Sequence, residues 1–351
     1  MAIPDPTSNA TTACRAAWRA GGPGRGFARR GAGFLCLLCL AVAASGARAE
    51  SVEIAHRWGT TEIEGPPERV VSLSYTGVDY FLALGVTPVA YRAWYGGDEN
   101  GLWPWAAPHL DTADPVVMRG EIDIEAVARL RPDLIEATYS GISQAEYAAL
   151  SRIAPVLAPP GGVGEFGATW DVMLDLVGRA TGRAAQARTV ETDLLDRFDR
   201  IAAAHPGWAG QSAVVAWPDG PLVYGPDDPR MAVLDRLGFG LPDAARRLNR
   251  GGFYFRLDPE LTAPLDADVV IWLDVGAGVE AVLDHPLRHT LRIVAEGREI
   301  VAEPDLAAAL SYASPLSIPF ALDRLVPRLE DALDGSARTP VAGAAEAGLA
   351  P

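Results

Sequence analysis

The stretch Asp123-Ile-Glu125-Ala-Val-Ala-Arg-Leu-Arg-Pro-Asp133-Leu-Ile135 decides the fold class, because its pattern returns as Asp258-Pro-Glu260-Leu-Thr-Ala-Pro-Leu-Asp-Ala-Asp268-Val-Val-Ile271. In both copies a second acid follows the Glu by eight residues and leads into a hydrophobic run. An Asp at a helix cap, a Glu in the first helical turn and a buried strand make one αβ unit. One such unit in each half of the chain predicts two similar lobes, with a ligand cleft between them.

The first 49 residues have the pattern of a targeting segment. A basic stretch that includes Arg29-Arg30 precedes an apolar run over 32–44, and this run is too short to span a bilayer as a stable helix. Ala47-Arg48-Ala49 fits an A-x-A cleavage site, so residues 1–49 are expected to be a signal peptide that is cleaved near Ala49. Sec export and twin-arginine export both stay open.

Composition narrows the possible partners. All three cysteines lie in the predicted signal peptide, so the mature chain offers no thiol to a disulfide, a metal or a nucleophilic reaction. Cys36 and Cys39 each follow a Leu, where lipoprotein processing requires a small residue, so we expect a soluble product. The mature chain has 24 Arg, no Lys and 44 acidic residues, a net charge of about −20. A surface this acidic argues against nucleic acid and anionic membranes as partners.

The order of hydrophobic patterns predicts two doubly wound α/β lobes joined by a single long linker helix. Strand-like and helix-like segments alternate in both halves, as in a mostly parallel sheet covered by helices. From Trp170 to Ile201 apolar residues recur at three- and four-residue steps, which predicts one long helix with Gly182 as the place for a bend. The expected domains are an N-terminal lobe (50–168), the inter-lobe helix (169–205), a C-terminal lobe (206–334) and a disordered tail (335–351).

Shorter elements can be predicted from the same patterns. We expect a β-hairpin or an edge segment at 52–64, helices that stop at Gly85 and Gly238, and a final helix at about 315–333. The expected strands lie at 69–73, 86–91, 133–137, 155–158 and 212–217. The segment 92–118 is a long loop rich in Trp, Gly and Pro, and its length indicates a functional role.

The order of these segments resembles the periplasmic binding proteins that feed ferric siderophores, cobalamin or haem to ABC importers. The resemblance covers about residues 52–332. It rests on His56-Arg-Trp-Gly with Arg69-Val-Val-Ser-Leu73, Leu82-Ala-Leu-Gly-Val-Thr-Pro88, Glu121-Ile-Asp-Ile-Glu-Ala with Arg131-Pro-Asp-Leu-Ile135, Leu150-Ser-Arg-Ile-Ala-Pro155 and Glu296-Gly-Arg-Glu-Ile300. It implies two α/β lobes joined by one rigid helix, and therefore only slight opening and closing.

The resemblance also implies a function for the repeated Glu. In this family one acidic residue on each lobe docks into Arg residues of the membrane permease, and Glu125 and Glu260 occupy those positions. Exposed charges of this kind steer docking and fix orientation. The alternative is that both residues only complement helix N-termini. The implied protein is a monomeric, periplasmic carrier of a ferric siderophore that delivers its ligand to an ABC permease in the inner membrane.

Aromatic and arginine side chains are the candidate ligand-binding residues, because aromatic rings pack against the organic shell of a chelate and Arg pairs with its anionic oxygens. Arg119 stands where relatives present an Arg, and Tyr139 follows a strand at the carboxyl edge of its sheet. The full set of candidates is Trp94, Tyr95, Arg119, Tyr139, Trp217, Tyr254, Arg256 and Tyr312, with Trp103 and Tyr224 as further aromatics. The alternative for each aromatic is core packing, and for Arg119 an ion pair. Hydroxamate, catecholate and carboxylate chelates, haem and cobalamin all stay open as ligands.

Other chemistries find less support. The five His are dispersed, and Pro286 disfavours a regular helix that would pair His285 with His289 on zinc, so neither a metal site nor a cofactor is expected. The segment Gly162-Val-Gly164-Glu-Phe-Gly167 fits a dinucleotide fingerprint but lacks the strand and acid that should follow, and is interpreted as a flexible junction. Hydrolase motifs and a Cys nucleophile are absent from the mature sequence. An enzyme that uses a pair of carboxylates stays open as an alternative, and so does a binding protein that acts without a permease.

Overall fold

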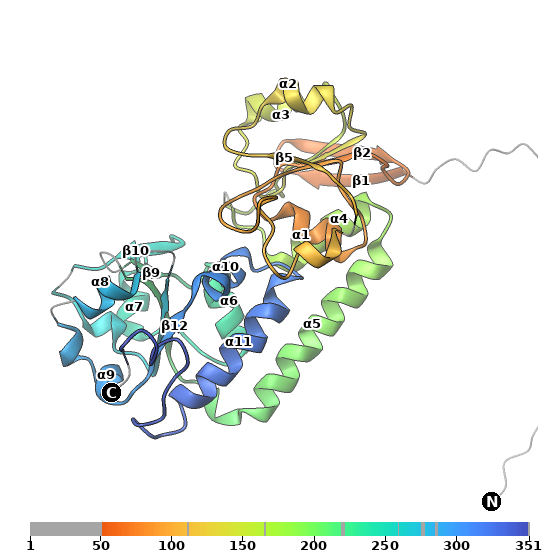
Figure 1. Ribbon diagram of the computed structural model, residues 1–351. Helices are drawn as coiled ribbons and strands as arrows, with labels where there is room; N and C mark the ends of the chain where they lie inside the picture. The colour runs from red at the N-terminus through yellow and green to blue at the C-terminus, as the bar shows by residue number, and fades with distance from the viewer. Residues whose placement is uncertain are drawn as a thin grey trace, which may run out of the picture. The chain divides into compact units, whose positions relative to one another are not determined.

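The computed structural model describes residues 51–349, except 111, 165, 219–221, 259, 275–277 and 285–286. The predicted signal peptide and its cleavage site therefore lie outside the described residues, as does His285. The described residues belong to one compact unit, Ala49–Pro351. Two α/β lobes make up this unit and one long helix connects them (Figure 1).

The N-terminal lobe is built on a five-stranded, wholly parallel sheet in the order β5-β4-β3-β6-β7. The antiparallel hairpin of β1 (Ser51–His56) and β2 (Gly59–Glu64) precedes the sheet, as predicted. The sheet strands are β3 (Val70–Ser72), β4 (Ala90–Arg92), β5 (Val116–Met118), β6 (Leu134–Glu136) and β7 (Val156–Leu157). The helices are α1 (Gly77–Ala83), η1 (Ala107–His109), α2 (Ile124–Arg129), α3 (Gln144–Leu150) and α4 (Trp170–Ala180).

The C-terminal lobe has a mixed sheet in the order β10-β9-β8-β11-β12. Strands β8, β11 and β12 run parallel, and β9 pairs antiparallel with both of its neighbours, β8 and β10. Its strands are β8 (Ala213–Trp217), β9 (Leu222–Tyr224), β10 (Tyr254–Arg256), β11 (Val269–Leu273) and β12 (Glu299–Ala302). The helices are α6 (Pro229–Arg236), α7 (Asp243–Leu248), η3 (Ala263–Leu265), α8 (Gly278–Leu283), η4 (Arg288–Thr290), α9 (Arg292–Ala295), α10 (Pro304–Tyr312) and α11 (Ser317–Ala332). The two-lobed α/β prediction is confirmed, and the antiparallel edge is a feature that it lacked.

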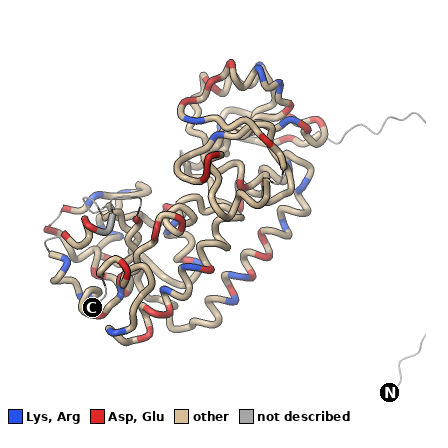
Figure 2. Tube along the Cα trace, viewed as in Figure 1, with Lys and Arg blue, Asp and Glu red and all other residues tan. Residues whose placement is uncertain are grey.

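The segment 169–205 forms two helices instead of one bent helix, and the break falls at Gly182, the residue predicted for the bend. Gly182 has φ +70°, a left-handed conformation that ends α4, and Arg183 N–H then bonds back to the carbonyl of Gly178 at 2.7 Å. The linker proper is α5 (Ala184–Ala204), followed by η2 (Pro206–Trp208). Acidic and basic residues are interspersed along α5 (Figure 2), as on a helix with only three buried side chains.

The first αβ unit of the repeat forms as predicted, but the second does not. The Asp123 side chain caps α2 by accepting from Ala126 N–H, and β6 follows. In the second copy a turn, in which Asp258 accepts from Glu260 N–H, leads only into the three-residue η3. Pro264 explains the difference, because it lacks an N–H donor and its ring clashes with the carbonyl four residues earlier.

The second acid of each repeat fastens neighbouring strands together, a role that the pattern alone did not reveal. The Asp133 carboxylate accepts from the N–H groups of Glu68 and Arg69, at the start of β3. The Asp268 carboxylate accepts from the N–H and hydroxyl of Ser212, at the start of β8. In both lobes the second acid of the repeat therefore hydrogen-bonds the start of one strand to the start of the neighbouring strand.

Two further expectations need correction. The strand predicted at 86–91 begins only at Ala90, since Pro88 has no donor for a strand ladder. The predicted disordered tail packs against the C-terminal lobe in the described residues 335–349: Val341, Ala344 and Leu349 are buried, and the carbonyl of Leu349 accepts from the partly buried Arg288. Small apolar side chains of the tail thus pack into the core of the C-terminal lobe, which the composition of the tail did not predict.

The long loop 92–118 joins the two lobes into one hydrophobic core. Trp105, from this loop, packs against Tyr312 and Phe320 of the C-terminal lobe, with ring centroids 5.4 and 5.2 Å apart. Trp105 Nε1 also donates to the fully buried Asp79 of α1, whose same oxygen accepts from Ser314 of the C-terminal lobe. A second seam lies along the linker, where Arg197 of α5 pairs with Asp323 of α11.

Candidate ligand-binding cleft

A cleft of about 800 Å³ lies between the lobes. Its N-terminal wall comes from residues that follow β3, β4 and β6, where the carboxyl ends of parallel strands present ligand-binding side chains. Its C-terminal wall comes from β8, β9, β10 and the first turn of α6. The lining residues are Tyr75, Trp94, Tyr139 and Phe166 from the N-terminal lobe, and Trp217, Leu222, Tyr224, Asp228, Arg230, Phe253, Tyr254 and Arg256 from the C-terminal lobe.

Glu136 holds the N-terminal wall in place. This carboxylate is fully buried and accepts hydrogen bonds from the hydroxyls of Ser72, Ser74 and Thr138 and from the N–H of Thr138. Ser74 Oγ in turn accepts from Tyr139 N–H at 2.7 Å. Through these hydrogen bonds the Glu136 side chain fixes the two turns that carry Tyr75 and Tyr139.

Arg92 supports the same wall, and in the part of the chain that the structure describes no acidic side chain lies within hydrogen-bonding distance of it. Its guanidinium donates to the carbonyls of Gly120 and Ser140 and to the hydroxyl of Tyr75, at 2.9, 3.1 and 3.0 Å. The Tyr75 ring centroid lies 4.2 Å from Arg92 Cζ. These direct contacts are neutral, but an acid lies nearby: hydrogen bonds from Ser143 lower the pKa of the Glu146 carboxyl, and the charge of Arg92 lowers it further.

An ion pair at the start of α6 forms the base of the C-terminal wall. Asp228 caps the helix by accepting from Arg230 N–H, and both of its carboxylate oxygens accept from Arg230 Nη1 at 3.0 and 2.9 Å. The Arg230 guanidinium also donates to Ser311 Oγ and lies 4.1 Å from the Tyr224 ring centroid. Desolvation raises the pKa of the Asp228 carboxyl, and the charge of Arg230 opposes that rise. The pair is held rigidly before any ligand arrives.

Exposed aromatic rings distinguish this cleft from ordinary surface. Trp217 and Tyr254 are 36% and 56% exposed although they are large apolar side chains, and Arg256 is also exposed. Trp217 is the last residue of β8, and Tyr254 and Arg256 lie on β10, an edge strand of the sheet. Burial raises the pKa of Tyr139 to about 12, so its hydroxyl faces the cleft as a neutral donor. Unburied rings beside hydrogen-bond donors are suited to an organic ligand that carries negative charge.

The structure brings together five of the eight predicted ligand-binding residues and separates three. Trp94, Tyr139, Trp217, Tyr254 and Arg256 line the cleft, as does the further aromatic Tyr224. Arg119 is exposed and donates to the carbonyl of Glu99 within the long loop. Tyr95 and the further aromatic Trp103 pack in the aromatic cluster behind Trp94, and Tyr312 joins the same cluster.

Sequence reasoning missed six residues that line the cleft: Tyr75, Phe166, Leu222, Asp228, Arg230 and Phe253. Tyr75 follows β3 as Tyr139 follows β6, so the rule that identified Tyr139 also applies to Tyr75. Asp228 and Arg230 flank Pro229 in a pattern that is typical of a helix start, which predicts α6 but not the place of these two side chains in the cleft. Phe166 lies inside the glycine-rich segment and carries no signal in the sequence that would identify it.

The two predicted docking residues are both exposed, one on each lobe. Glu125 lies in the first turn of α2, and Glu260 lies in the turn before η3. Within the described part of the chain, no group of three or more His, Cys, Asp or Glu side chains is placed to hold a metal ion. Over the same residues, no helix is both long and apolar enough to cross a membrane.

Comparisons with known proteins agree with this architecture. A family model described as periplasmic binding protein matches residues 70–306. A solved periplasmic solute binding protein from Mycobacterium smegmatis is 34% identical with a TM-score of 0.73, covering 81% of this chain and 99% of its own. PiaA of Streptococcus pneumoniae, solved in complex with ferrichrome, is 23% identical with a TM-score of 0.69 over 81% of this chain and 99% of its own, a likeness of fold alone.

Curated relatives match parts of the chain. The probable siderophore-binding lipoprotein YfiY of Bacillus subtilis is 28% identical over 228 residues, which are 62% of this chain and 67% of YfiY. The Fe(3+) dicitrate-binding periplasmic protein FecB of Escherichia coli is 35% identical over 99 residues, which are 28% of this chain and 32% of FecB.

Proposed function

Because this chain belongs to the periplasmic binding protein family, we propose that it is an extracytoplasmic solute-binding protein that captures a ferric siderophore and delivers it to an ABC permease. The cleft carries the proposal: its exposed rings and arginines match the organic shell and the anionic oxygens of an iron chelate. The names of YfiY and FecB support iron chelates as the class of ligand.

In this proposal the siderophore, not the protein, ligates the iron. Trp217, Tyr254 and Tyr139 pack against the organic shell, while Arg256 and the paired Arg230 face its negatively charged oxygens. Because Asp228, Ser311 and Glu136 already hold the walls in place, little ordering of side chains opposes binding. The protein is accordingly a carrier without a resident cofactor or a catalytic step.

Delivery in this proposal depends on both lobes. Glu125 and Glu260 dock into arginines of the permease in the inner membrane, and residues 1–49 direct the chain to the periplasm as a cleaved signal peptide. Two exposed carboxylates on separate lobes fix the orientation of the carrier, which places the cleft over the entrance of the permease. The family membership and the exposure of both side chains support this arrangement.

Tryptophan-fluorescence titration of the mature protein tests the function. Trp94 and Trp217 line the cleft, so a bound ferric chelate is expected to quench them. The panel holds ferric hydroxamate, catecholate and citrate-type chelates, with haem, cobalamin and free Fe(III) as comparators. Saturable quenching at submicromolar concentration by one chelate class, and none by free iron, is the expected result. Tight binding of haem or cobalamin would mean that the protein carries that compound instead of a ferric siderophore. No binding across the panel would overturn the proposal.

A further inference from the structure

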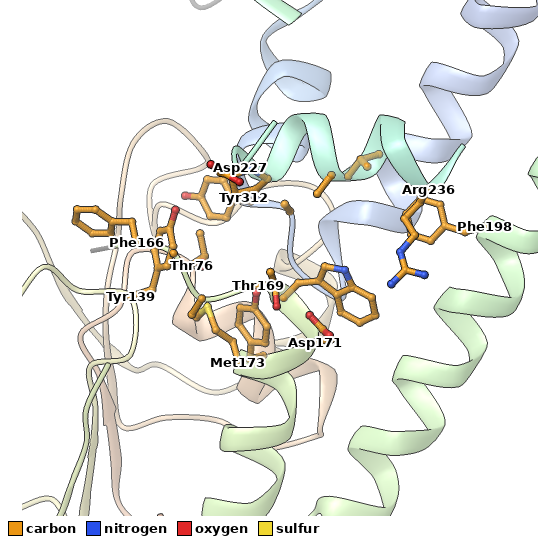
Figure 3. A pocket seen from close by; sticks show the side chains of 18 residues that line it. Thr76, Tyr139, Phe166, Thr169, Asp171, Met173, Phe198, Asp227, Arg236 and Tyr312 are labelled. Atoms are coloured by element: carbon orange, nitrogen blue, oxygen red, sulfur yellow. The ribbon is translucent and has the colours of Figure 1, made fainter. Parts of the chain in front are cut away.

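A second cavity, of about 200 Å³, lies behind the cleft and has no part in the proposed function so far. We call it the rear cavity. Its apolar wall comes from Tyr80 of α1, Trp170 and Met173 of α4, Phe198 of α5 and Val233 of α6. Met173 and Phe198 are labelled in Figure 3. The rear cavity thus lies among helices of both lobes and the linker.

The rear cavity adjoins the cleft and is separated from it by two side chains. Tyr139 and Phe166 line both spaces, and their ring centroids are 5.1 Å apart in an edge-on arrangement. Figure 3 shows these two rings at one end of the rear cavity and Phe198 and Arg236 at the other. The Tyr139–Phe166 pair therefore forms a partition between the two spaces.

The chemistry of the rear cavity suits an apolar group. Its charged residues, Asp227 and Arg236, are solvent-exposed, and Asp171 is partly exposed, so their charges lie toward water. A charged group placed among Tyr80, Met173 and Phe198 would lose hydration without a partner. An apolar cavity of about 150 Å³ is enough to admit a benzene ring, and the rear cavity exceeds that volume.

Phe166 has the features of a movable partition. Its φ of +58° lies in the left-handed region, which bulky side chains rarely adopt. It follows Gly162, which has φ +80°, and precedes Gly167, whose N–H bonds to the carbonyl of Gly164. Phe166 also borders a third cavity of about 150 Å³ beside Tyr75 and Arg92. Phe166 thus borders the cleft, the rear cavity and this third cavity.

We propose that the rear cavity is a subsite for an apolar arm of the bound chelate, an alkyl or aryl substituent remote from the iron, which enters past Phe166. The inference rests on the proposed function, because the chelate must first occupy the cleft. It makes the Tyr139–Phe166 partition a determinant of specificity: chelates that carry such an arm bind more tightly than those that lack one.

Two derivatives of one hydroxamate siderophore test this subsite. N-acetyl and N-benzoyl ferrioxamine B have the same iron-binding groups and the same charge, and differ in one aryl ring. The full-length mature protein is expected to bind the benzoyl compound about tenfold more tightly, from the apolar area that the ring buries. Ala232→Phe places a ring in the rear cavity from an exposed position of α6, so folding is preserved. Ala185→Phe, at an exposed position of α5, is the matched control.

The expected result is that Ala232→Phe removes the preference for the benzoyl compound, leaves affinity for the acetyl compound within twofold, and that the control variant behaves as wild type. Equal affinities in the wild type, or a preference that survives Ala232→Phe, would overturn the subsite. If neither compound binds, the protein does not carry hydroxamate chelates. Binding of benzene to the rear cavity, measured as a shift in melting temperature, then tests the apolar subsite by itself. A melting temperature raised by about 2 °C in the wild type, and not in Ala232→Phe, would uphold an apolar subsite; no shift would reject it.

Discussion

At the scale of single residues, Arg256 is the cleft cation that is easiest to test. It is exposed and lies on the edge strand β10, whereas Arg230 is committed to Asp228 and Ser311. Arg256→Gln is expected to weaken binding of an anionic ferric chelate about tenfold, because a charge-assisted hydrogen bond becomes a neutral one. The melting temperature should stay unchanged. Arg247→Gln, an exposed arginine on α7, is the control, and an equal loss of affinity in both variants would reject a specific contact.

Asp79 gives the protein a predictable dependence of stability on pH. Burial raises its pKa from 3.8 to about 6, while hydrogen bonds from Ser314 and Trp105 oppose the rise. Between these two pKa values the folded state binds more protons at Asp79 than the unfolded state does. The free energy of unfolding that this residue contributes therefore falls as pH rises from about 4 to 6, by roughly 3 kcal/mol when complete.

Asp79→Asn removes this dependence, since the amide does not titrate and keeps one acceptor oxygen for Ser314 and Trp105. Relative to wild type, the variant is expected to gain about 2–3 kcal/mol in free energy of unfolding between pH 4 and pH 7. Urea denaturation at several pH values measures this difference. Parallel stability curves for the two proteins would show that Asp79 does not titrate in this window.

At the scale of elements, what the sequence predicted depended on local signals. The hairpin, the strands beside Asp133 and Asp268, and the helix stops at Gly85 and Gly238 follow from short-range periodicity and capping, and all form. The break between α4 and α5 falls at Gly182, where a bend was predicted. Pro264 is the local cause of the missing second helix, and the repeated pattern concealed it. The residues that line the cleft were only partly predictable, because they come from turns that are far apart in the sequence and lie side by side only in the folded protein. Nothing along the chain connects Phe166 or Arg230 to Tyr139.

The two repeat elements differ in shape, yet both present an exposed Glu. If this pair docks the carrier, then Glu125→Arg together with Glu260→Arg is expected to reduce uptake of radiolabelled ferric chelate at least tenfold, because two attractive contacts become repulsive. Chelate affinity in solution should be unchanged. Glu62→Arg with Asp193→Arg, two exposed acids elsewhere, controls for the change in net charge. Normal uptake by the first double variant would favour a binding protein that acts without a permease.

At the scale of the whole molecule, the loop 92–118 limits how far the lobes can move. Trp105 packs among rings of the C-terminal lobe, and Asp79 bonds to Ser314 across the same contact. Pulling the lobes apart would expose this shared core to water. The radius of gyration is therefore expected to change by less than about 0.5 Å when the cleft fills, as small-angle scattering can measure. Trp105→Ala should increase that change, and a larger change in the wild type would contradict a rigid connection.

The shared aromatic core has a kinetic consequence. When the empty and the loaded carrier have almost the same shape, the surface offered to a permease is also almost the same, and shape alone cannot reject an empty carrier. Empty carriers then occupy permeases without delivering iron, so they act as competitive inhibitors of loaded ones. Making more carrier than the available chelate can fill would slow import, and the cell would gain most when the amount of carrier follows the supply of its ligand.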